Sequence, residues 1–213
     1  MLLVGMFDSP YVRRVAVSMR TLGLPFEHAN WSVGRDQARI AELNPLGQVP
    51  VLVLDDGEVL VDSNAILDHL DQVVGPERAL VPPRGDARRR VLHLATLAAG
   101  IADKARLQVY EHVFRPPERA HEPLRLRLRA QMLAACVQVD QACAARRDAS
   151  WLVGDAMTQA DITLACAFTF ALESVGLPVE EAALPSLRAH HAKLEQLPAF
   201  REIYVPFDAP VVG

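Results

Sequence analysis

The sequence predicts an amino-terminal α/β sandwich with a mixed sheet, followed by an all-helical domain. The pattern over residues 1–76 runs strand, helix, strand, helix, strand, strand, helix. A parallel unit followed by a hairpin gives a mixed sheet covered by helices. Residues 77–85 are rich in proline and glycine and predict a linker, and residues 86–213 carry almost no strand pattern. The predicted domains are therefore 1–76 and 86–213.

The first elements follow from apolar spacing and from helix-end residues. The apolar run at residues 2–7 predicts a strand, and apolar side chains three and four apart predict a helix over 10–22. Pro10 suits the first helical position, and Gly23 suits the left-handed residue after the helix. Similar patterns predict a strand over 26–32 and a short helix over 35–43.

The clearest hairpin lies within residues 49–63, where two runs of valine and leucine flank Asp55-Asp56-Gly57. Residues 63–74 then return to helical spacing.

The second domain is predicted to be a bundle of helices. The segment 158–175 is apolar nearly all round and predicts the central helix. Residues 123–130 alternate as a strand does, but good helix formers follow them and favour a helix. Thr158 and Asp161 have the spacing of a capping box at the start of the central helix. The expected helices are 86–115, 123–146, 158–175, 185–196 and 198–204.

The composition indicates a globular protein that does not bind nucleic acid. The 213 residues are 51% hydrophobic and carry a net charge of −4, which does not attract phosphate backbones. Three cysteines, without disulfide or metal-ligand spacing, fit a reducing cytoplasm and no metal. Residues 162–172 are too few to cross a membrane, and Asp8 ends the first apolar run too early for a signal peptide.

Ser9 raises the first functional question, because it stands between the first strand and the first helix. It could be only a helix cap, or it could be a catalytic hydroxyl, and the same geometry serves both. The motif NPLGQVPVL at residues 44–52 raises a second question. A trans Pro50 would be structural, whereas a cis Pro50 would turn the backbone of Val49 outward to pair with an extended peptide.

The motif VDSNAI, residues 61–66, lies where a strand ends and a helix begins. Ser63 could be a simple N-cap. The helix start could also hold a ligand carboxylate while Asp62 holds an ammonium group. Both interpretations stay open on the local sequence.

In this order, and together with WLVGDAMTQADITLA in the helical domain, these motifs resemble the cytosolic glutathione transferase superfamily. The resemblance covers essentially the whole chain. It implies a thioredoxin-like domain followed by a helical bundle, with glutathione as co-substrate, a homodimer and a role in detoxification. Ser9 matches the catalytic hydroxyl of serine-type members, which stabilises a thiolate. Phe7, where tyrosine-type members carry a phenol, has no hydroxyl, and Tyr11 is the fallback.

The resemblance also implies roles for other residues. Asp103 resembles an acidic residue that reaches the neighbouring subunit's glutathione, although a surface charge is the alternative. Arg35 and Arg39 could meet the glycine carboxylate or form a solvated helix face. The residues implied for glutathione are Gln48, Val49, Pro50, Asp62 and Ser63, and those for a hydrophobic electrophile are Leu107, Tyr110 and Val113.

Three functions compete on the sequence. The first is a transferase that activates the glutathione thiol at Ser9, and the second is an isomerase or dehalogenase on the same scaffold. The third is a non-catalytic interaction module, which the presence of Ser9, Asp62 and Ser63 disfavours. Elsewhere in the chain, Cys136 and Cys143 are expected in the core, and His190 and His191 are expected to be a solvated pair.

Overall fold

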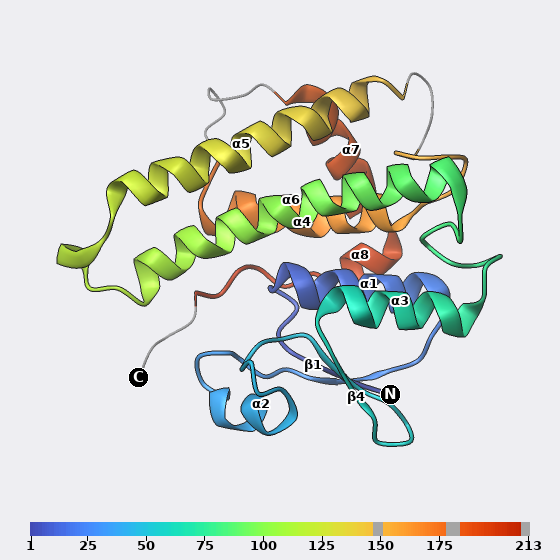
Figure 1. Ribbon diagram of the computed structural model, residues 1–213, viewed down its shortest axis with the longest axis horizontal. Coiled ribbons are helices and arrows are strands. Elements are labelled where there is room, and N and C mark those ends of the chain that lie inside the picture. Colours follow the sequence, from blue (N-terminus) through green and yellow to red (C-terminus); the bar gives the residue numbers. More distant parts are fainter. Residues whose placement is uncertain (147–150, 178–183, 210–213) are drawn as a thin grey trace. The chain divides into compact units, whose positions relative to one another are not determined.

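The computed structural model describes residues 1–146, 151–177 and 184–209, which form two compact units (Figure 1). The first unit contains residues 1–80 together with 198–209, and the second contains 81–197. The predicted helical domain ran to residue 213, so the position of the last segment differs from the prediction. The reason is that Phe200 is fully buried and Arg13 Nη2 donates to its carbonyl oxygen at 3.2 Å.

The first unit is built on a four-stranded mixed sheet of order β2-β1-β3-β4, as the sequence predicts. The pair β1 and β2 is parallel, and the pairs β1–β3 and β3–β4 are antiparallel. The turn Asp55-Asp56-Gly57 joins the last two strands. The strands are β1 (Leu2–Val4), β2 (Glu27–Ala29), β3 (Val51–Val53) and β4 (Val59–Val61).

Two long helices of the first unit, α1 (Pro10–Leu22) and α3 (Ser63–Val74), lie side by side and have the predicted bounds (Figure 1). Every α1 residue from Val12 to Met19 is buried, because this helix packs between other elements of its unit. Gly23 has φ 69° and ends α1 in the left-handed conformation. The shorter helices are α2 (Gln37–Leu43) and α8 (Pro198–Glu202).

Within the described residues, the regular secondary structure of the second unit is all helical. Its central helix is α6, whose residues from Gln159 to Ala171 are all buried. The alternating stretch 123–130 lies inside α5, so helix propensity decided that segment. Pairwise contacts join α4 to α5 and α6, and α7 to α5 and α6. The helices are α4 (Gly85–Val113), η1 (Pro117–Arg119), α5 (Glu122–Ala144), α6 (Gln159–Ser174) and α7 (Pro185–Glu195).

A buried polar network holds the start of α6. Asp161 Oδ2 accepts from the main-chain nitrogen of Thr158 at 2.9 Å and from its hydroxyl at 3.0 Å, so the predicted capping box forms. Asp161 Oδ1 accepts from Leu152 N and from His190 Nε2, both at 2.9 Å. The expectation of a solvated histidine pair is wrong for His190, which is 1% exposed. Its Nδ1 accepts from Arg146 at 2.7 Å, so Nε2 carries the proton.

None of the described helices is long and apolar enough to cross a membrane.

Candidate functional site

Ser9 is the N-cap of α1, and its Oγ accepts from the main-chain nitrogen of Val12 at 3.5 Å. That distance is long for a hydrogen bond, so the hydroxyl is held only loosely as a cap. The hydroxyl proton has no acceptor among the described residues. Ser9 is therefore a half-buried donor at a helix N-terminus, where negative charge is stabilised.

Gly5 brings the start of α1 against the loop that precedes β3. A Cβ atom built on Gly5 would lie 2.5 Å from Val12 Cγ2 and 2.8 Å from Val49 Cβ. The φ of Gly5 is +128°, a conformation that side chains with a Cβ rarely adopt. Only glycine fits here, and this close approach places Val49 beside the turn of α1 that Ser9 caps.

The Val49–Pro50 peptide bond is cis. Neither the N–H nor the C=O of Val49 has a hydrogen-bond partner among the described residues. Two main-chain groups next to the start of α1 are thus free to pair with an extended ligand, as strand addition requires.

Asn44 shapes the loop that leads to Pro50. Its side chain is 2% exposed, donates to the carbonyl of Gln48 at 2.8 Å and accepts from Leu46 N at 3.0 Å. The Gln48 side chain itself is exposed. Asn44 holds the loop from inside while leaving the Gln48 side chain available. Asn44 was not among the residues predicted for the site, although asparagine before proline is a turn signal in the sequence.

The start of α3 differs in one detail from the sequence-based interpretation. The N-cap is Asp62, whose Oδ1 accepts from Asn64 N at 2.7 Å, and Ser63 is the first helical residue. Asp62 has φ 69°, a strained conformation for a residue with a side chain, and such strain concentrates at functional sites. Ser63 is 3% exposed, and no described residue bonds its hydroxyl.

Arg14 joins the starts of α1 and α3. Its Nη2 donates to Asn64 Oδ1 at 2.5 Å, and the residue is only 4% exposed. The helix that carries Ser9 and the helix that carries Asp62 and Ser63 are thus linked directly. In the sequence, the available signal was an arginine placed among the apolar residues of the predicted helix 10–22.

The two arginines considered for a ligand carboxylate have different surroundings. Arg39 lies 4.1 Å over the Trp31 ring and 4.0 Å from Asp36, on the exposed side of α2. Arg35 lies 3.8 Å from Met6 Sδ, on the loop that leads to Ser9, and 3.6 Å from Asp208. Only Arg35 contacts that loop.

The carboxyl of Asp8, next to Ser9, has a pKa above its ordinary value. Burial raises its pKa, and the charge of Asp208 raises it further, while main-chain N–H groups of Asp208 and Ser9 partly offset both.

The residues expected to contact an electrophile lie on α4 in the helical unit. Leu107 is 37% exposed, and Tyr110 and Val113 are half-buried. Their spacing of three residues places them on one side of the helix. Asp103, the expected cross-subunit residue, lies 3.7 Å from Arg106 of its own helix.

The cysteines are structural, as predicted. Burial raises the pKa of Cys136 to about 12 and that of Cys143 to about 11, and Cys166 is 1% exposed. The thiols of Cys136 and Cys143 are therefore protonated at neutral pH, and burial shields all three cysteines from reagents. The described residues contain no group of three or more His, Cys, Asp or Glu side chains able to hold a metal ion.

Comparison with known proteins identifies the family. Family models for the glutathione S-transferase N-terminal and C-terminal domains match residues 3–78 and 102–198. A glutathione transferase family member from Pseudomonas fluorescens Pf-5, solved with bound glutathione, is 33% identical with a TM-score of 0.82. The alignment covers 97% of this chain and 99% of that one. The chain belongs to the glutathione S-transferase superfamily.

Two further proteins are similar to this chain in structure or in sequence. A glutathione S-transferase from Methylobacillus flagellatus with bound glutathione is 26% identical, with a TM-score of 0.86 over 97% of this chain and 99% of its own. YibF of Escherichia coli K12, described as an uncharacterized GST-like protein, is 35% identical over 133 residues. That alignment spans 62% of this chain and 64% of YibF. The first curated relatives are thus matched over less than two thirds of their own length.

Proposed function

We propose that this protein is a glutathione transferase that stabilises the glutathione thiolate at Ser9 and adds it to a small hydrophobic electrophile. The observation that carries the proposal is the unused hydroxyl proton of Ser9 beside the unpaired main-chain groups of Val49. Glutathione bound to the superfamily members from Pseudomonas and Methylobacillus supports the choice of thiol.

The proposed binding mode uses the charges of glutathione. The main chain of Val49, before the cis bond to Pro50, pairs with the cysteinyl part. The start of α3 holds the γ-glutamyl end: free N–H groups and the Ser63 hydroxyl face its carboxylate, and Asp62 faces its ammonium. Gln48, exposed on the same loop, assists. This arrangement leaves the sulfur directed toward Ser9.

The chemistry requires Ser9 to donate a hydrogen bond and not to ionise. The thiol proton leaves to solvent, and the Ser9 hydroxyl and the N-terminus of α1 stabilise the thiolate. The sulfur then donates its electron pair to the electrophilic carbon. The π bond at that carbon opens, and its displaced electron pair takes up a proton from solvent. Each unit by which the thiol pKa falls corresponds to about 1.4 kcal/mol of preferential stabilisation of the thiolate. No metal enters this scheme.

The remaining parts of the proposal concern the electrophile and the assembly. Leu107, Tyr110 and Val113 are proposed to contact the electrophile, and a cytoplasmic homodimer is proposed in which Asp103 reaches the partner's glutathione. A role in detoxification would follow from the electrophile.

The test is ultraviolet difference absorption of the thiolate on adding glutathione to the wild type and two variants. Ser9→Ala removes both the cap and the donor. Ser9→Asp keeps a cap acceptor but cannot donate at neutral pH. We expect a thiolate band only in the wild type, bound glutathione in Ser9→Ala, and turnover there lower by on the order of 100-fold, as for loss of one donor to an anion.

Two results would contradict the proposal. Glutathione binding without a band in any protein would mean that another group activates the thiol. No binding at all would favour the interaction module.

A further inference from the structure

The chain between β1 and Ser9 is held by a side chain from β2. Strands β1 and β2 are parallel, and Gly5, just after β1, donates its N–H to Ala29 O at 2.9 Å. His28 precedes Ala29, and its Nε2 donates to the Gly5 carbonyl at 2.7 Å. A carbonyl oxygen can only accept, so Nε2 carries the ring proton. Gly5 is therefore bonded to the end of β2 through both its N–H and its C=O.

The same histidine also stacks on Phe7. The centres of the two rings lie 3.8 Å apart, and the ring planes differ by 8°. Phe7 is half-buried, and among the described residues no other ring contacts it. His28 thus holds the chain at two points, the main chain of Gly5 and the side chain of Phe7.

Phe7 lies in the turn that ends at Ser9. Ser9 N donates to Met6 O at 3.2 Å, which closes a four-residue turn with Phe7 and Asp8 at its centre. Because only two residues separate Met6 from Ser9, the direction of Phe7 and the position of Ser9 cannot change independently. The contacts of His28 therefore act on the residue that caps α1.

Two main-chain bonds set the direction of the Ser9 side chain. Its carbonyl accepts from Arg13 N of α1 at 2.8 Å, whereas its N–H belongs to the turn and makes the longer bond of 3.2 Å. The cap contact between Ser9 Oγ and Val12 N is longer still, at 3.5 Å. The turn is thus the weaker support of Ser9, and it is the support that His28 strengthens.

We propose that His28 is a positioning residue, which keeps the Ser9 hydroxyl directed at the glutathione sulfur by clamping Gly5 and Phe7. Its consequence for catalysis rests on the proposed function. In a variant without the clamp, Gly5 stays bonded to Ala29 through its N–H and so stays beside Val49. The clamp should therefore affect formation of the thiolate and leave the affinity for glutathione unchanged.

The first measurement needs no glutathione. Hydrogen exchange of the Ser9 N–H, followed by NMR in the free protein, reports how often the turn opens. His28→Ala removes both contacts, His28→Phe keeps a ring but no donor, and His28→Gln keeps a donor but no ring. We expect exchange to accelerate about tenfold in His28→Ala and about threefold in each of the other two variants, the scale of one hydrogen bond and one ring pair.

The second measurement uses glutathione. Thiolate difference absorption is recorded against pH, and steady-state kinetics are measured with an α,β-unsaturated ketone as electrophile. We expect His28→Ala to raise the pKa of the bound thiol by about one unit and to lower kcat below that pKa by about tenfold, with KM for glutathione within about twofold of the wild type. His28→Phe and His28→Gln should each recover part of the loss. A purely structural role would lower the free energy of unfolding without this separation of kcat from KM.

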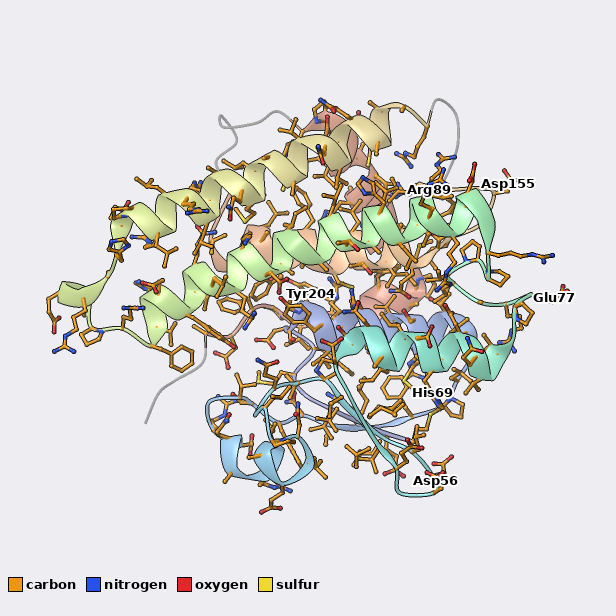
Figure 2. All side chains as sticks on the ribbon, in the orientation of Figure 1. Asp56, His69, Glu77, Arg89, Asp155 and Tyr204 are labelled. Atoms are coloured by element: carbon orange, nitrogen blue, oxygen red, sulfur yellow. The ribbon has the colours of Figure 1, made fainter. Side chains whose placement is uncertain are left out.

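The matched control is His69→Ala, the same substitution in the same unit. Figure 2 labels His69, which belongs to α3 and is half-buried. Its side chain has no hydrogen bond, ion pair or ring contact with any described residue. His69→Ala should change neither the exchange of Ser9 nor the kinetics.

Three results would overturn the inference. They are unchanged exchange at Ser9 in His28→Ala, faster exchange with an unchanged thiolate band, and equal effects of His69→Ala. A wild type without a thiolate band would contradict the proposed function instead, and the exchange measurement would still decide whether His28 holds the turn.

Discussion

Asp161 offers the sharpest test of how the helical unit is held together. Its carboxylate is fully buried and accepts four hydrogen bonds, two from main-chain nitrogens, one from a hydroxyl and one from His190. Replacing it by alanine removes all four and leaves the donors buried without an acceptor. These donors would lose their hydrogen bonds to water on folding and gain none in the protein, so the substitution is strongly destabilising.

The expected magnitude follows from those four bonds. A hydrogen bond to a charged group contributes about 1.5–3 kcal/mol, and the burial of the carboxylate, relieved by the substitution, offsets part of the sum. We therefore expect Asp161→Ala to lower the free energy of unfolding by about 4–6 kcal/mol, a large part of a typical total of about 5–15 kcal/mol. Asp161→Asn keeps the shape but turns an amide donor toward other donors, and should cost about 2–4 kcal/mol.

Urea unfolding followed by circular dichroism and tryptophan fluorescence measures the change. Trp151 reports on the same region, because Lys193 of α7 lies 5.2 Å over its ring. The control is Asp155→Asn, which changes the same charge on the exposed loop before α6 and should stay within about 0.5 kcal/mol of wild type. If Asp161→Ala lowers the free energy of unfolding no more than this control does, the buried network does not hold the start of α6.

Three further predictions follow from contacts of single residues. Gly5→Ala should lower the free energy of unfolding by about 2–4 kcal/mol, because the new Cβ would clash with Val12 and Val49 and because φ is +128°. The control is Gly100→Ala, in open space on α4, which should raise the free energy of unfolding by about 0.5–1 kcal/mol. Urea unfolding midpoints measure both changes. Asp8→Asn should flatten the pH dependence of stability. Burial raises the pKa of Asp8, so ionisation of this carboxyl lowers the stability of the wild type as pH rises from about 4 toward neutrality. Urea midpoints that fall equally with pH in the wild type and in Asp8→Asn would contradict this. Iodoacetamide should leave Cys136 and Cys143 unmodified in the native protein and label both after unfolding, as mass spectrometry would show.

Helices could be predicted from the sequence because their signals are local. The apolar spacing, Pro10 at the first position and Gly23 after the last gave α1 its observed bounds. Strand lengths were overestimated for an equally local reason. The run at residues 2–7 forms a strand only to Val4, because Gly5 at φ +128° turns the chain away.

Contacts between distant residues could not be predicted in the same way. The hydrogen bond between Asp8 and Asp208 joins residues 200 apart, and the one between Arg13 and Phe200 joins residues 187 apart. His190 was misjudged for this reason: nothing near it in sequence reveals the Asp161 carboxylate that its ring meets, 29 residues away. Hydrophobic periodicity indicates which face of a helix or strand is buried, but it does not identify the polar groups that this face contacts.

The geometry of Ser9 allows its role as a helix cap and its proposed catalytic role to be compared in free energy. A serine N-cap is typically worth about 1 kcal/mol, and a contact of 3.5 Å to Val12 N should deliver less than that. Helix α1 does not depend on the contact, since its residues from Val12 to Met19 are buried and Gly23 closes its far end. If the Ser9 hydroxyl served mainly as a cap, Oγ would be expected closer to Val12 N than the observed 3.5 Å. The loose contact leaves the Ser9 hydroxyl able to turn and donate to a sulfur, so removing it should reduce thiolate formation far more than stability.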